Sequence, residues 1–174
     1  FHEAWWRFVS RHDVLRTTFR WEGLDAPVQD VHSEIIVPLE QHDWRHLSEP
    51  AQLAGVQTYL RTDREKGFDL TQPPLLRLTL FRLGEMHYQL VWTFYHGLLD
   101  GRSFPLALQE VFALYETILR GGIPTPEEGV PYQCFIEWTQ QQDWAAAEDF
   151  WRQKLQGFSA PTPILHALAP NTVP

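Results

Sequence analysis

A histidine and an aspartate stand four residues apart in the stretch TFYHGLLDGRS, residues 93–103, at the end of a hydrophobic run. The imidazole of His96 titrates near neutral pH, so it could take a proton from an attacking amine or alcohol. Asp100 is close enough in sequence to influence it, although a buried carboxylate would need a partner of its own. The spacing therefore points to acid–base chemistry on a loop.

Other chemistries fit this stretch less well. Two ligands are too few for a metal site, and no nearby Cys, His or Glu completes one. A phosphate cradle needs a different glycine spacing, and the chain has no Gly-x-Ser-x-Gly elbow for a serine nucleophile. Ser103 is more simply the N-cap of a helix. A packed or surface histidine without chemical function is the plain alternative for His96.

The elements that must position this loop follow from hydrophobic periodicity and from turn residues. Alternating β-branched and aromatic residues predict strands at 14–21, 27–32, 35–39, 75–83 and 86–95, the last two forming a hairpin around Gly84. Helical spacing and caps predict helices at 1–11, 48–66, 103–119, 132–141 and 143–155. Residues 121–129 are expected to be a linker. The pattern predicts an α/β fold, a two-layer sandwich whose mixed, mostly antiparallel sheet has helices packed on it.

Composition narrows the class of protein. With 44% hydrophobic and 21% charged residues, the chain is typical of one soluble domain. The formal charge of −8 and the absence of a basic run argue against nucleic-acid binding. No apolar stretch reaches the ~20 residues of a membrane span, and the single cysteine, Cys134, fits a cytoplasmic location. The aromatic content of 14% suggests a surface that a partner covers.

Three segments together resemble the condensation domains of nonribosomal peptide synthetases, which belong to the chloramphenicol acetyltransferase-like superfamily. YHGLLDGRS, residues 95–103, is similar to the His-His-x-x-x-Asp-Gly signature of that family. RHDVLRTTF, residues 11–19, resembles the upstream Arg-His-x-x-Leu-Arg-Thr-x-Phe motif, and FDLTQPPLLRLTLFRL, residues 68–83, resembles the segment before the strand pair. All three lie in the family's order.

The resemblance implies a role for several residues. His96 matches the second signature histidine, which faces the tunnel where two thioesters meet and deprotonates or orients the acceptor amine. Asp100 matches the structural aspartate, which turns away and pairs with arginine. Gly101 matches the signature glycine, whose amide lies near the reacting carbonyl. Arg16 matches the second arginine of the upstream motif, so it is either part of a polar network under the loop or a strand-edge surface charge.

The chain departs from the family pattern at one signature position, where Tyr95 replaces the first histidine. That position is generally structural in the family, and tyrosine keeps a ring and a polar tip. Tyr95 is therefore counted among the supporting residues of the candidate site, with Asp100, Gly101 and Arg16.

The resemblance also implies an assembly. Condensation domains consist of two acyltransferase-like lobes with a tunnel between them, so residues 1–155 would be the N-terminal lobe and 156–174 an exit segment toward a second lobe. The expected partners are that lobe and peptidyl carrier proteins, which present substrates on phosphopantetheine. No metal or redox cofactor is implied for this lobe.

The expected activity is amide-bond formation between carrier-bound thioesters, with the isolated chain inactive. Two alternatives stay open. One is a non-catalytic or degenerate lobe that binds a carrier protein or another lobe. The other is a stand-alone acyltransferase with a coenzyme A donor, which would need to trimerise to build its site.

Overall fold

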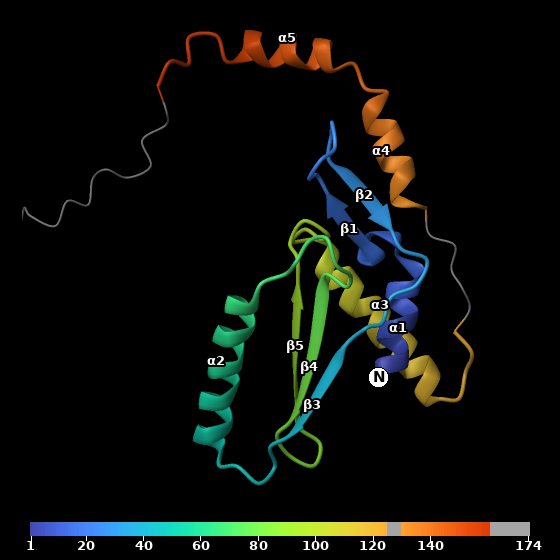
Figure 1. Cartoon of the computed structure of the whole chain (residues 1–174), viewed down its shortest axis with the longest axis vertical. Coiled ribbons are helices and arrows are strands. Elements are labelled where there is room, and N and C mark those ends of the chain that lie inside the picture. Colours follow the sequence, from blue (N-terminus) through green and yellow to red (C-terminus); the bar gives the residue numbers. More distant parts are fainter. Residues whose placement is uncertain (125–129, 161–174) are drawn as a thin grey trace, which may run out of the picture. The chain divides into compact units, whose positions relative to one another are not determined.

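The computed structural model describes residues 1–124 and 130–160 (Figure 1). The chain divides into two compact units, Phe1–Tyr132 and a second that begins at Gln133. In chain order the elements of the first unit are α1 (His2–Arg11), a 3₁₀ turn (Asp13–Arg16), β1 (Thr17–Arg20), β2 (Val28–Val31), β3 (Leu39–Asp43), α2 (Glu49–Lys66), β4 (Leu76–Arg82), β5 (Tyr88–Phe94) and α3 (Ser103–Leu119).

The described strands of this unit form a small hairpin and a three-stranded sheet. β1 and β2 pair antiparallel, with Thr17 opposite Val31. The larger sheet has the order β3-β4-β5, in which β3 runs parallel to β4 and β4 runs antiparallel to β5. The mixed α/β class and the hairpin at 75–95 are confirmed, and the strands lie in two sheets rather than one.

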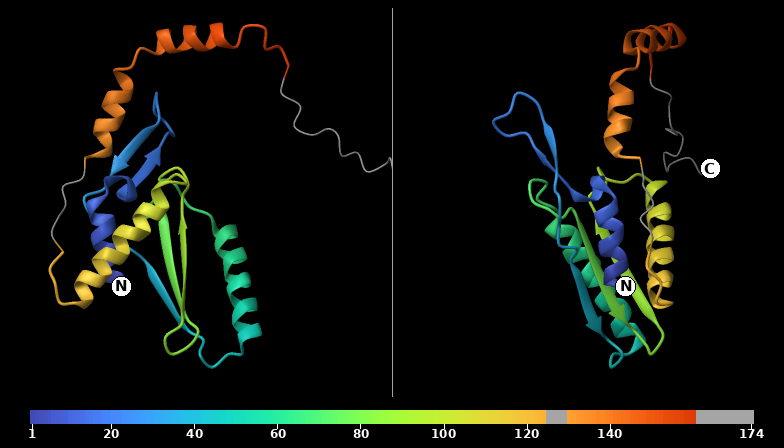
Figure 2. Two further views of the ribbon diagram at one scale, coloured as in Figure 1. Left: turned by 180° about the vertical axis from the view of Figure 1, so that it is seen from behind. Right: turned by 90° about the vertical axis from the view of Figure 1, so that its right-hand side faces the viewer.

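Helices lie against both faces of the three-stranded sheet, as the edge-on view in Figure 2 shows. α1 and α3 pack on each other and on the face that carries Leu76 and Leu78. α2 covers the opposite face, where Val56 contacts the cluster around Phe81 and Val91. Because successive residues of β4 point to opposite faces, one strand supplies both cores.

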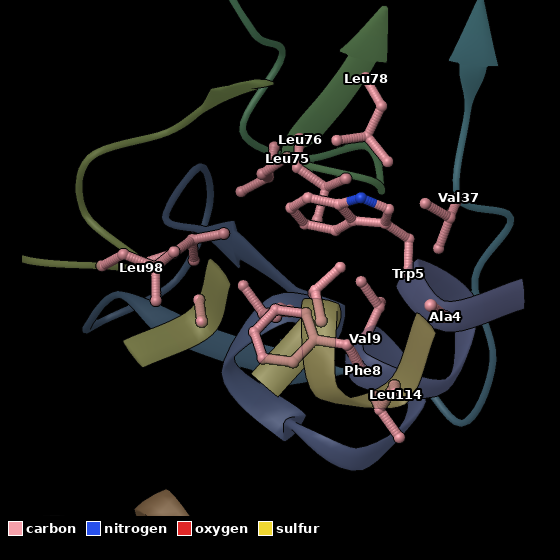
Figure 3. Packing of buried hydrophobic residues seen from close by; sticks show 14 residues of the cluster. Ala4, Trp5, Phe8, Val9, Val37, Leu75, Leu76, Leu78, Leu98 and Leu114 are labelled. Carbon is pink, nitrogen blue, oxygen red and sulfur yellow. The ribbon is translucent and has the colours of Figure 1, made fainter. Parts of the chain in front are cut away.

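The larger core is centred on Trp5, which is fully buried (Figure 3). Its indole lies beneath Leu75, Leu76 and Leu78 in Figure 3, and it meets Trp92 of β5 edge to face at 4.9 Å. Burying an aromatic side chain of this size contributes roughly 1.5–3 kcal/mol. The packing fixes α1 against the strand that leads into the His96 loop.

The face under α2 holds a buried polar network. Asp63 is 7% exposed, and its carboxylate accepts hydrogen bonds from Arg77 Nε at 2.7 Å and from Thr93 Oγ1 at 2.6 Å. Arg77 also donates to the carbonyl of Gly67 at 2.7 Å and lies 4.0 Å from the ring centroid of Phe68. The network thus joins Phe68 and Arg77, which both lie in the matched segment 68–83.

Two strand predictions need correction. The strand expected at 14–21 begins only at Thr17, because Asp13–Arg16 forms a 3₁₀ turn, and the Thr17 hydroxyl donates to the carbonyl of Asp13 at 2.9 Å. The strand expected at 35–39 lies later in the chain, at Leu39–Asp43. This β3 is an edge strand with exposed polar residues, so its sequence lacks the apolar alternation that identifies half-buried strands.

The helix predictions at 1–11, 48–66 and 103–119 are confirmed by α1, α2 and α3. The two later helices are also confirmed, as α4 (Tyr132–Gln140) and α5 (Trp144–Lys154). The Asp143 carboxylate caps α5 by accepting from the backbone N–H of Ala146 at 2.9 Å.

Parts of two predicted segments, 125–129 of the linker and 161–174 of the exit segment, lie outside the described residues. The assignment of 1–155 to one lobe stays a prediction. None of the helices in the described ranges is both long and apolar enough to cross a membrane.

Candidate functional site

The loop between β5 and α3 turns two leucines inward and presents His96 outward. Leu98 and Leu99 are 7% and 8% exposed and belong to the larger core, whereas His96, Gly97 and Asp100 are exposed. A hydrogen bond of 3.0 Å from the Leu98 N–H to the Tyr95 carbonyl closes a tight turn around His96. The leucines therefore anchor the loop, and the imidazole lies at the surface of this unit.

The imidazole of His96 makes no hydrogen bond or ion pair with any residue in the described ranges. Its ring lies 6.3 Å from that of Phe94, and Phe94 lies 6.5 Å from Phe104 of α3. Both ring nitrogens are therefore available to a substrate, beside an aromatic surface made by Phe94 and Phe104.

Asp100 holds the loop through the backbone at the start of α3. Its Oδ1 accepts hydrogen bonds from the N–H of Arg102 at 3.0 Å, the N–H of Ser103 at 2.8 Å and the Ser103 hydroxyl at 2.6 Å. The hydrogen bonds from Ser103, and then the one from Arg102, lower the pKa of Asp100 below its ordinary value. The prediction that Ser103 caps α3 is wrong, because Ser103 is the first helical residue and Asp100 satisfies its N–H.

Arg16 and Asp100 are not brought together in the part of the chain that the structure describes. The Arg16 guanidinium donates to the carboxylate of Asp13 and to the carbonyl oxygens of His32 and Ser33. Its side chain is 12% exposed, so it is not a strand-edge surface charge either. Arg16 ties the 3₁₀ turn to the end of β2. Among the described residues Asp100 contacts an arginine only through the backbone N–H of Arg102, and no arginine side chain forms an ion pair with it.

Tyr95 is the point where the three matched segments meet. Its ring packs edge to face on Phe19 of the matched segment 11–19, with 5.8 Å between the ring centroids. Its N–H donates to the carbonyl of Leu75, in the matched segment 68–83, at 2.9 Å. Its hydroxyl has no hydrogen bond to the described residues. Sequence reasoning did not identify Phe19 as part of the site, although its place in the matched segment 11–19 could have indicated it.

The two glycines of the loop have different environments, and neither has a positive φ. At Gly97 an added Cβ would lie 2.4 Å from Cε1 of the Tyr95 ring, so that ring excludes any side chain. At Gly101 nothing lies within 4 Å of the Cβ position. The Gly101 N–H also has no hydrogen-bond acceptor in the described residues, which leaves it free to donate to a ligand.

A cavity of about 270 Å³ lies on the core side of the loop, lined in part by Leu98, Leu99 and Ser103. His96 is not part of its lining. The described ranges contain no cluster of three or more His, Cys, Asp or Glu side chains that could hold a metal ion.

Comparison with known proteins identifies the family. The family model for the condensation domain matches residues 1–173. A linear gramicidin synthase from Brevibacillus parabrevis is 44% identical over 164 residues, which are 94% of this chain and 3% of that protein. Bacitracin synthase 1 from Bacillus licheniformis is 33% identical over 158 residues, 91% of this chain and 3% of that protein.

Solved structures share the fold. The SgcC5 protein from Streptomyces globisporus matches with a TM-score of 0.73 and 25% identity over 90% of this chain and 36% of that one. A mutant starter condensation domain of the rhizomide synthetase RzmA matches with a TM-score of 0.81 and 21% identity over 92% of this chain and 39% of that one.

The α/β fold is thus the one found in these solved structures, and the chain belongs to the condensation domain family. It spans 3% of the length of the curated relatives cited above and just over a third of the length of the solved structures.

Proposed function

We propose that this chain supplies the His96 lobe of an enzyme that forms amide bonds between carrier-bound aminoacyl or peptidyl thioesters. The observation that carries the proposal is the loop itself, in which buried leucines and Asp100 hold an exposed, unpaired imidazole, and in which the backbone N–H of Gly101 has no acceptor among the described residues. The gramicidin and bacitracin synthases among its relatives support a peptide-forming reaction.

The proposed reaction needs a base, a positioned acceptor and a stabilised oxyanion. The acceptor nitrogen attacks the thioester carbon of the donor and forms the C–N bond. His96 holds the proton that the nitrogen loses and passes it to the departing thiolate as the C–S bond breaks. The Gly101 N–H would donate to the carbonyl oxygen as negative charge develops on it.

The proposal includes a second lobe and carrier proteins as partners. One side of α3 supports a protein partner, because Phe104, Phe112 and Leu119 are all at least 38% exposed there. Contiguous exposed apolar surface of this kind commonly marks a protein–protein contact. The carriers would present both thioesters on phosphopantetheine, which is a substrate arm rather than a cofactor of this lobe. A cytoplasmic location is part of the proposal, supported by the free, exposed thiol of Cys134.

The test is reconstitution. The condensation domain with both lobes is mixed with a donor and an acceptor carrier, each loaded with an aminoacyl thioester, and the acceptor carrier is analysed by mass spectrometry. We expect the acceptor to gain the donor acyl group with the two-lobe protein and not with the 174-residue chain alone. Transfer from acyl-coenzyme A but not from a loaded carrier would overturn the proposal in favour of a stand-alone acyltransferase.

A further inference from the structure

The ring of Tyr95 occupies the space in which a residue at position 97 would place its side chain. A Cβ built on Gly97 would lie 2.4 Å from Cε1, 2.9 Å from Cζ and 3.1 Å from Cδ1 of that ring. Real Cβ atoms do not approach a carbon to 2.4 Å, so a side chain at position 97 would have to displace either the ring or the turn. The two residues flank His96 on both sides along the chain.

The Tyr95 ring cannot easily move away, because it is held by two other parts of the fold. It packs on Phe19 of β1 at 5.8 Å, and the Tyr95 backbone is fixed by the hydrogen bond from its N–H to Leu75. Its carbonyl accepts from Leu98, which is itself buried in the core. The steric clash caused by a methyl group at position 97 would therefore be relieved by a displacement of the exposed turn that carries His96.

We propose that Tyr95 and Gly97 act as one positioning unit for His96, in which the tyrosine ring packs under the turn and the glycine leaves room for it. The inference rests on the proposed function, since positioning matters only if His96 acts on the substrate. The ring does the positioning and the phenol oxygen does not, because the Tyr95 hydroxyl has no hydrogen bond to the described residues. In this chain the ring at position 95 therefore requires the absence of a side chain at position 97.

The test is a double-mutant cycle in the two-lobe protein, measuring kcat and KM for condensation between loaded carriers. We expect Gly97→Ala to lower kcat by about tenfold or more with little change in KM, since small displacements of a reacting group are costly. In a Tyr95→Ala background the same Gly97→Ala change should alter kcat by less than about twofold. An equal loss in both backgrounds would overturn the proposal.

Two further variants separate the effect of the Tyr95 ring from that of its hydroxyl and from that of removing any tyrosine near β5. Tyr95→Phe keeps the ring and should retain kcat within about twofold of the unmodified protein, whereas Tyr95→Ala should lower it. Tyr88→Ala, at the other end of β5, is the matched control and should leave kcat unchanged, because Tyr88 is an exposed residue far along the strand. A loss of kcat in Tyr95→Phe equal to that in Tyr95→Ala would contradict the role of the ring.

A readout without catalysis distinguishes this inference from the proposed function. Proton–nitrogen NMR follows the ring resonances of His96, assigned by their absence in His96→Gln. Gly97→Ala should shift these resonances in the natural background and not in Tyr95→Ala. If this coupling is seen while His96→Ala condenses at the full rate, the packed pair stands and the proposed function fails. If His96 is needed for condensation while the Gly97→Ala shift is the same in both backgrounds, the positioning unit is refuted.

Discussion

The carboxylate of Asp100 and the hydroxyl of Ser103 lie 2.6 Å apart, and the Ser103 N–H donates to the same carboxylate oxygen at 2.8 Å. These two hydrogen bonds join the end of the His96 loop to the first turn of α3. The contact ties the loop to the start of α3: Asp100 lies two residues before the N-cap residue, Arg102, and its carboxylate accepts from the N–H groups two and three residues later, as a capping side chain does. His96 is thus held from two directions, by this cap and by the buried leucines.

The first prediction concerns the titration of the Asp100 carboxyl group in acid. The hydrogen bonds from Ser103 and Arg102 favour the charged form of Asp100 and lower its pKa in the folded state. Because this pKa is lowered, the hydrogen-bonded Asp100 carboxylate contributes its full stabilisation of the fold at pH values above its ordinary pKa of 3.8. That stabilisation is lost as the pH falls through the lowered pKa of the folded state. Carbon NMR of the Asp100 carboxyl group should therefore show a titration midpoint below 3.8.

Ser103→Ala provides the control for this titration, because it removes the hydroxyl donor and keeps the backbone donors. Its midpoint should lie closer to 3.8 than that of the natural chain. A natural midpoint at or above 3.8 would show that the cap does not form in solution.

The second prediction concerns the network under α2. Asp63→Asn leaves the Arg77 guanidinium, 17% exposed, without its anionic partner. Breaking one side of a largely buried pair is strongly destabilising, so the free energy of unfolding should fall by about 3 kcal/mol. Urea denaturation measures this value, and Asp25→Asn in the exposed turn before β2 should change it by less than about 0.5 kcal/mol. Equal effects from the two variants would refute the structural role of Asp63.

The third prediction concerns Gly55 in the middle of α2. A Cβ there would lie 2.9 Å from two ring atoms of Trp44, and Trp44 is itself packed on Phe81 at 4.4 Å. Gly55→Ala should therefore destabilise the protein by about 1 kcal/mol, although alanine is the better helix former.

The same substitution should change sign when the ring is removed. In a Trp44→Leu background, Gly55→Ala should stabilise the protein by up to about 1 kcal/mol, because the helix propensity of alanine is then unopposed. Thermal unfolding of the four proteins checks both values. Stabilisation by Gly55→Ala in the natural background would contradict the packing of Trp44 on α2.

The sequence predicts those elements that are long and strongly patterned. The hairpin of β4 and β5 follows from alternating apolar residues, and α3 from its periodicity and its proline-bearing first turn. The sequence pattern predicts β3 too early in the chain, because Glu40, Gln41 and His42 give this edge strand no apolar signature. Its position depends on parallel pairing with β4, a contact between distant parts of the chain.

In the candidate site, too, the sequence predicts some features, whereas others depend on how the chain folds. The residue type and spacing identify His96 as the group to test, and the family resemblance identifies the loop that carries it. The partners of Asp100 and Arg16 could not be deduced, because they depend on how the loop and the 3₁₀ turn are bent. The exclusion of a side chain at Gly97 by the Tyr95 ring is likewise a property of the turn and not of spacing.

The central claim is that the exposed imidazole of His96 takes part in amide-bond formation. The measurement that tests it most directly is the single-turnover rate of condensation between loaded carriers by the two-lobe protein, compared for His96→Ala and His87→Ala. The two histidines flank β5 at opposite ends and both are exposed. We predict a loss of about 100-fold or more for His96→Ala, the usual contribution of a general base, and an unchanged rate for His87→Ala. A His96→Ala protein that condenses at the natural rate would contradict the account.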